Sequence, residues 1–131
     1  NQIRYGTLIV ISNDPLKVVG GGSYMDELIR KAGGRNVFGD LKEAYPTTTV
    51  EEILSRQPEI LIIPTPREQD YAQLIGMYPA LDNTPAAASK QVYIIHPDLL
   101  YRPGPRMIQG LIELTHLIHN SLPLPVPSHA E

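Results

Sequence analysis

Residues 91–119 have the sequence QVYIIHPDLLYRPGPRMIQGLIELTHLIH, which contains the order of elements that decides the fold. The apolar run at 92–95 predicts a buried strand. A loop with three prolines and one glycine follows, carries Tyr101, Arg102 and Arg106, and leads into a predicted helix. Open α/β sheets bind ligands beyond the carboxyl ends of their strands, so this loop is predicted to border a ligand site.

The helix predicted after this loop has one wide apolar face and one polar face, as expected of a helix that covers a sheet. The apolar positions are Met107, Ile108, Leu111, Ile112, Leu114, Leu117 and Ile118, and the polar positions are Gln109, Glu113, His116 and Asn120. His116 and His119 are three residues apart, which is a spacing that permits metal binding. No adjacent carboxylate completes a site, so no metal site is predicted.

The same alternation of strands and helices occurs upstream. Continuous apolar runs at 7–11 (TLIVI) and 59–63 (EILII) are typical of strands buried on both faces. A helix capped by Ser23 is predicted to bury a stripe and to end at Gly33, and the stripe consists of Met25, Leu28, Ile29 and Ala32. A second helix begins at Thr48 or Thr49 and stops before Pro58, and a short one covers 71–77. The segment 12–22 is predicted to be a loop. This order predicts a three-layer α/β/α fold with a mainly parallel sheet.

Composition indicates one globular domain at 1–120, followed by a Pro-rich extended tail at 121–131. Pro85 and three prolines of the tail are expected outside any strand or helix. The net charge of −3, without a Lys/Arg cluster, argues against nucleic-acid binding. The absence of cysteine excludes disulfides and thiolate metal sites. No apolar run approaches the ~20 residues of a membrane span. No Ser-His-Asp, H-E-x-x-H or nucleophile-elbow pattern is present, so the protein is not expected to be an enzyme.

Three blocks carry a family resemblance: VVGGGSYMDELIRKAGGRNVFGD (18–40), TTTVEEILSRQPEILII (47–63) and VYIIHPDLLYRPGPRMIQGLIELTHLIH (92–119). Together they resemble the C-terminal lobe of ABC-transporter substrate-binding proteins for ferric siderophores, haem and cobalamin. The resemblance implies one half of a bilobal binding protein, without resident cofactor, whose N-terminal lobe and interlobe helix are missing from this chain. An excised lobe is the favoured interpretation. The resemblance also implies an extracytoplasmic location, in the periplasm or lipid-anchored at the cell surface, and an ABC permease as partner.

Tyr101 and Arg102 are the foremost candidates for ligand binding. The resemblance places both on the cleft wall. An arginine offers planar donors to carboxylate or catecholate oxygens, a tyrosine offers a stacking surface, and a phenolate can bind ferric iron. Arg106, in the first turn of the last helix, is instead expected to form an ion pair that holds the loop.

Other ligand candidates come from the ends of the other strands. Lys17 and Tyr24 belong to the region after the first strand, Arg67 to the loop after the middle strand, and His96 ends the strand before the Tyr101 loop. The three glycines at 20–22 permit close approach of a backbone, and turn geometry at the start of a helix is their expected role. Their spacing matches neither a dinucleotide fingerprint nor a P-loop.

Glu51 is expected to contact protein rather than ligand. The resemblance matches it to an acidic residue that docks onto an arginine of the membrane permease. The alternative is a capping box, in which Thr48 would use Glu51 or Thr49 would use Glu52.

A ferric siderophore is the preferred ligand, because Lys17, Arg67 and Arg102 would make the cleft basic. Cobalamin favours aromatic walls, whereas the chain has no Trp and a single Phe, Phe38. Haem would need an axial Tyr101 or His96. Two other classes remain open: a chelatase-like enzyme acting on a tetrapyrrole, which would require a His/Glu pair, and a stand-alone α/β domain that binds a partner protein.

Overall fold

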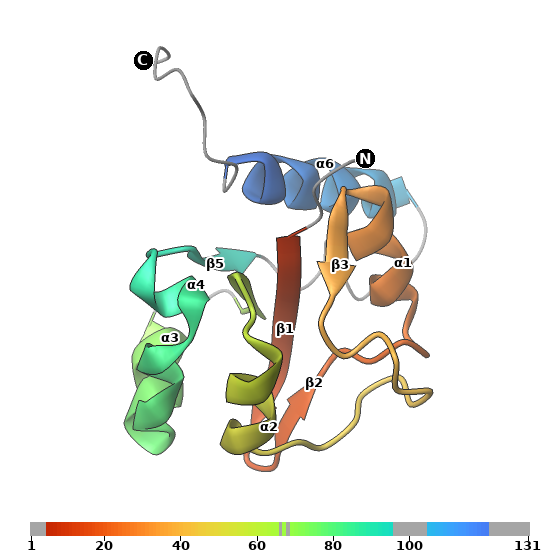
Figure 1. Ribbon diagram of the computed structural model, residues 1–131. Coiled ribbons are helices and arrows are strands. Elements are labelled where there is room, and N and C mark those ends of the chain that lie inside the picture. The colour runs from red at the N-terminus through yellow and green to blue at the C-terminus, as the bar shows by residue number, and fades with distance from the viewer. Residues whose placement is uncertain (1–4, 66, 68, 96–104, 121–131) are drawn as a thin grey trace, which may run out of the picture.

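The computed structural model describes residues 5–65, 67, 69–95 and 105–120. These residues form a five-stranded, mainly parallel sheet with helices on both faces (Figure 1). The three-layer α/β/α prediction is therefore confirmed. No helix among the described residues is both long and apolar enough to cross a membrane.

The elements have the following bounds. The strands are β1 (Tyr5–Asn13), β2 (Leu16–Val18), β3 (Gly34–Asn36), β4 (Ile60–Pro64) and β5 (Val92–Ile95). The helices are α1 (Tyr24–Lys31), α2 (Val50–Arg56), α3 (Gln69–Met77), the 3-10 helix η1 (Pro79–Asn83), α4 (Pro85–Ala88) and α6 (Pro105–Asn120). The tail predicted at 121–131 lies outside the described residues.

Strand β1 is the centre of the sheet. It pairs in parallel with β4 on one side, where Leu8 is opposite Leu61, and β4 pairs in parallel with β5. On its other side β1 pairs first with β3, in parallel, and then with β2, antiparallel. Strands β1, β4 and β5 therefore end at one common edge of the sheet, which we call the carboxyl edge.

The prediction of a loop at 12–22 is wrong, because this segment contains β2. Leu16 and Val18 are buried while Lys17 between them is half-buried, which is the alternation of a strand. Three residues are too few to show this period against the turn residues around them. The hairpin from β1 to β2 turns at Asp14 and Pro15, which are joined by a cis peptide bond.

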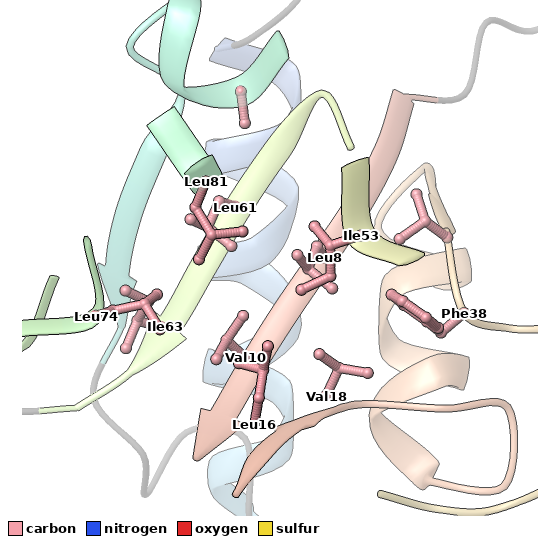
Figure 2. Close-up of a cluster of buried hydrophobic side chains, with 12 residues drawn as sticks. Leu8, Val10, Leu16, Val18, Phe38, Ile53, Leu61, Ile63, Leu74 and Leu81 are labelled. Carbon is pink, nitrogen blue, oxygen red and sulfur yellow. The ribbon is translucent and has the colours of Figure 1, made fainter. Parts of the chain in front are cut away.

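Each face of the sheet has its own apolar cluster, because successive residues of a strand point to opposite faces. Leu8 and Val10 of β1 pack with Ile53, Leu61 and Leu74 under α2, α3, η1 and α4 (Figure 2). On the other face, α1 and α6 cover the sheet, and the buried members of the cluster include Ile9, Met25, Leu28, Ile29, Ile62, Leu114 and Ile118. The apolar stripe predicted for α1 is thus confirmed.

The helix starts follow local hydrogen bonding. Ser23 caps α1 as predicted, and its Oγ accepts from the Met25 N–H at 3.0 Å. Gly33 follows α1 with a φ of 98°, a conformation that glycine adopts without strain. Thr49 rather than Thr48 caps α2, and its Oγ1 accepts from the Glu52 N–H at 3.2 Å.

Two predictions about helices are wrong. Ile112, assigned to the apolar face of the last helix, is 53% exposed on α6. The apolar face is wider than the strip that packs on the sheet and on α1, and Leu114 and Ile118 occupy that strip. Pro85, expected outside any helix, begins α4, where its missing N–H costs no hydrogen bond and Thr84 provides the cap.

Candidate functional site

A depression of about 290 Å³ lies at the carboxyl edge. It is formed where β1 and β4 end and α3 begins. Its polar lining includes Ser12, Asn13, Thr65, Arg67, Asp70 and Gln73. Parallel α/β sheets bind ligands at this edge, since the connections that leave the strands there diverge and leave open space. The carboxyl edge is therefore the candidate binding surface of the chain.

Arg67 lies in this depression, as predicted, but its charge is paired. Its Nη2 is 3.1 Å from Oδ1 of Asp70. The Thr65 hydroxyl donates to Oδ2 of the same carboxylate and accepts from the Arg67 N–H at 3.2 Å. These contacts form a small polar cluster in which the Arg67 side chain is 62% exposed. An exposed pair of this kind stabilises the fold little, but it neutralises the cation that the sequence assigned to the ligand.

Asp70 is a residue that the sequence interpretation missed. Its side chain is only 16% exposed, and among the described residues no hydrogen bond reaches its Oδ1 atom. This oxygen contacts Arg67 as an ion pair and keeps the capacity to accept a hydrogen bond from another donor. The available signal was positional: Asp70 lies in the first turn of α3, directly after the loop that leaves β4.

Lys17 is not brought into this depression. It is half-buried on β2, where it lies opposite Ser12 and forms an isolated bridge to Thr47. Leu16 and Val18 enter the cluster under α2, so Lys17 points to the other face of the sheet. The prediction that Lys17 lies in a loop is therefore wrong, and its role in ligand binding stays a prediction.

Tyr24 is the first residue of α1 and does not line the depression. Its ring packs against the cluster under α1 and α6, and no described residue forms a hydrogen bond with its buried hydroxyl. Burial raises the pKa of the Tyr24 phenol above its usual range, and the nearby Tyr45 adds to this shift. The phenol is therefore neutral at physiological pH.

Glu51 is exposed in the first turn of α2. The N–H of its neighbour Glu52 donates to the Thr49 cap, and the Glu52 carboxylate forms an ion pair with Arg56 at 2.9 Å. None of the ion pairs between described residues involves Glu51. The capping alternative for Glu51 is therefore excluded, and its carboxylate faces solvent.

Arg56 joins α2 to the segment that precedes it. Its Nη1 is 2.6 Å from Oδ1 of Asp40 and donates to the Val37 carbonyl at 2.7 Å, and its guanidinium lies 4.4 Å above the Phe38 ring. The hydrogen bond from Arg56 holds the pKa of Asp40 below its usual range. These contacts hold the C-terminal end of α2 in place.

The remaining predicted site residues are not placed. Tyr101, Arg102 and His96 lie outside the described residues, as does the side chain of Arg106. His116 is exposed on α6. Within the described part of the chain, no group of three or more His, Asp or Glu residues is arranged to hold a metal ion.

The geometry of this edge agrees with the comparisons to known proteins. The family model described as "Periplasmic binding protein" matches residues 4–99. A vitamin B12-binding protein of Vibrio parahaemolyticus is 30% identical over 114 residues, which are 86% of this chain and 39% of the relative.

Two solved structures show the same fold. A periplasmic solute-binding protein of Staphylococcus epidermidis matches with a TM-score of 0.80 and 25% identity over 91% of this chain and 46% of its own. A periplasmic haem-binding protein of Roseiflexus matches with a TM-score of 0.79 and 22% identity over 92% of this chain and 48% of its own. The chain thus spans about half the length of these solved structures, and less of the curated relative.

These matches confirm the expected family and favour a binding protein over an enzyme, because the relatives are named as binding proteins. The family match covers most of the chain, and the fold and the open carboxyl edge agree with it. The chain belongs to the periplasmic binding protein family.

Proposed function

We propose that this chain is one lobe of the solute receptor of an ABC importer and forms one wall of its ligand cleft. The observation that carries the proposal is the polar depression at the carboxyl edge of β1 and β4 in a member of the periplasmic binding protein family. The mechanism is capture and delivery: hydrogen-bonding groups hold the solute without changing it. An extracytoplasmic location follows from this role.

The proposal includes a second lobe. Binding sites for small molecules usually enclose about 300–1,000 Å³ and bury most of the ligand. The depression measures about 290 Å³ and is open, so it would contact part of a large solute. An opposite wall is needed to remove the rest of the solute from water.

A metal chelate is the proposed ligand, with a corrinoid as first candidate. The relative from Vibrio parahaemolyticus is a vitamin B12-binding protein. The groups along the depression are suited to the amide side chains of a corrinoid: Asn13 and Gln73 both donate and accept, and Oδ1 of Asp70 accepts.

A ferric siderophore, the ligand favoured by the sequence, is the second candidate. The siderophore was expected to bind the Arg67 guanidinium, but this guanidinium is paired with Asp70. The pairing weakens the argument that the cleft is basic. Arg102 would supply a cation if it lines the cleft. Haem would require Tyr101 or His96 as axial ligand.

Glu51 is proposed as the docking residue for the permease. It is exposed, it lies in the first turn of α2, and no described ion pair engages its carboxylate. A carboxylate in this state is available to a guanidinium on a partner at low desolvation cost.

The test is calorimetric titration of the two-lobe protein with three probes: cyanocobalamin, ferrichrome and haemin. Cyanocobalamin is expected to bind with a dissociation constant of about 1 μM or less, equivalent to about −8 kcal/mol. Tight binding of ferrichrome alone would select the second candidate. Failure of all three probes at about 100 μM would refute the proposal of a metal-chelate receptor.

A further inference from the structure

Three consecutive glycines, Gly20 to Gly22, connect β2 to α1, and the chain that leaves β3 lies directly on them (Figure 1). A Cβ atom on Gly20 would be 2.4 Å from the Glu43 carbonyl oxygen. On Gly21 it would be 2.3 Å from the Gly39 oxygen, and on Gly22 it would be 2.2 Å from the Lys42 oxygen. All three neighbours are backbone atoms, which cannot rotate away as a side chain does.

Conformation does not explain these glycines. Among the described glycines, only Gly33 has a positive φ. The triplet does form a turn at the start of α1, as expected, and the Ser23 N–H donates to the Gly20 carbonyl at 3.3 Å. This turn has no positive φ, so it does not by itself require glycine. Glycine is required at 20–22 because another backbone occupies the space of a side chain.

The contact is a set of hydrogen bonds as well as a close approach. The N–H groups of Gly20, Gly21 and Gly22 donate to the carbonyls of Ala44, Leu41 and Glu43 at 2.9, 2.9 and 3.1 Å. Two further hydrogen bonds join β2 to the chain between β3 and α2. The Val18 N–H donates to the Pro46 carbonyl, and the Thr48 N–H donates to the Leu16 carbonyl. We call residues 20–22 the glycine seat and residues 41–48 the seated loop.

The seated loop leads directly into the proposed docking helix. The Thr48 N–H, its last bond to β2, is only three residues before Glu51. Thr49 then caps α2, and Arg56 holds the other end of the helix against Val37 and Asp40. The seat thus holds the start of α2 and Arg56 holds its end, while Ile53 in its middle is buried on the sheet.

We propose that Gly20, Gly21 and Gly22 are positioning residues for permease docking: the seat fixes the seated loop and thereby the location of the Glu51 carboxylate. This inference rests on the docking role proposed for Glu51. A Cβ in the seat must displace the seated loop, and the first turn of α2 would move with it. An interface that recognises one carboxylate by geometry loses affinity when that carboxylate shifts.

The test is a double-mutant cycle on the two-lobe protein, with affinity for the permease of its importer, reconstituted in nanodiscs, as the readout. Glu51→Ala alone is expected to weaken binding about tenfold, as for loss of one charge pair at an interface. Gly22→Ala is expected to cause a similar loss. The double variant is expected to bind no more than about twofold worse than either single variant, because the carboxylate is already misplaced.

The matched control is Gly76→Ala, since a Cβ on Gly76 in α3 meets nothing within 4 Å. It is expected to bind the permease as the unaltered protein does. Additive losses in the cycle, about hundredfold for the double variant, would overturn the positioning role, as would Gly22→Ala behaving like Gly76→Ala. Unchanged affinity of Glu51→Ala alone would instead refute the docking proposal, and the seat inference with it.

A second measurement on the unaltered protein covers the case in which Gly22→Ala does not fold. Amide hydrogen exchange at Gly20, Gly21, Gly22 and Thr48 is expected to be at least about a hundredfold slower than in an unprotected loop. Exchange of these amides at the rate of an exposed loop would show that the seat does not hold the seated loop, and would overturn the inference.

Discussion

Ile53 provides a quantitative test of how α2 is held on the sheet. It is the one buried residue of this helix, it is 0% exposed, and it packs in the cluster with Leu8 and Leu61 (Figure 2). Replacement by alanine removes three carbon atoms. At about 0.8 kcal/mol for each buried methylene group, the lost transfer free energy is about 2.4 kcal/mol. The cavity that remains raises the expected loss of unfolding free energy to about 3 kcal/mol.

The assay is urea unfolding of Ile53→Ala followed by circular dichroism, with Ile112→Ala as matched control. Ile112 is 53% exposed on α6, so the same substitution there is expected to change the unfolding free energy by less than about 0.5 kcal/mol. A loss below about 1 kcal/mol for Ile53→Ala would refute the anchoring of α2 by this side chain. An equal loss for both variants would refute the assigned burial.

Three further predictions concern single groups. Arg56 lowers the pKa of Asp40, so the stability that this carboxylate contributes is present above its unfolded pKa of about 3.9 and is lost as the pH falls through the folded pKa. The urea midpoints of Asp40→Asn and of the unaltered protein should therefore differ at pH 7 and converge at low pH. A difference that stays constant with pH would contradict this. Tyr24→Phe removes a buried hydroxyl without a described partner, so thermal unfolding should show unchanged or higher stability, whereas a loss above about 1 kcal/mol would indicate a partner. Replacing Tyr101 and Arg102 together with alanine should weaken binding of cyanocobalamin by the two-lobe protein about tenfold or more in a fluorescence titration, and unchanged affinity would remove both from the cleft wall.

The strands and helices with strong local patterns were predictable. The apolar run at 7–11 and the stripe of Met25, Leu28 and Ile29 both indicate burial. Residues 7–10 and the stripe are buried in the structure, and Ile11 is half-buried. Strands β2 and β3 were missed because each has only three residues, too few to display a period of two. Their conformation depends on pairing with β1.

The candidate site was predictable as a place and less so as a set of residues. The carboxyl edge follows from the order of strands and helices, and Arg67 lies there as expected. Its pairing with Asp70, three residues later in the chain, was not considered in the sequence interpretation. Lys17 was misplaced because its strand was missed, and with it the face to which the side chain points.

Local order along the chain was sufficient to specify the α/β/α layers, the helix cap at Ser23 and the family, because periodicity and capping depend on neighbouring residues. The choice of Thr49 over Thr48 as the cap of α2 came from the structure. The seat at Gly20 to Gly22 depends on contacts with a segment distant in sequence, whereas Arg67 pairs with Asp70 only three residues away. A glycine triplet is compatible with a turn, a phosphate loop or a close approach. A Cβ on Gly22 would be 2.2 Å from the Lys42 oxygen, so the close approach is what requires glycine in a segment that also forms a turn.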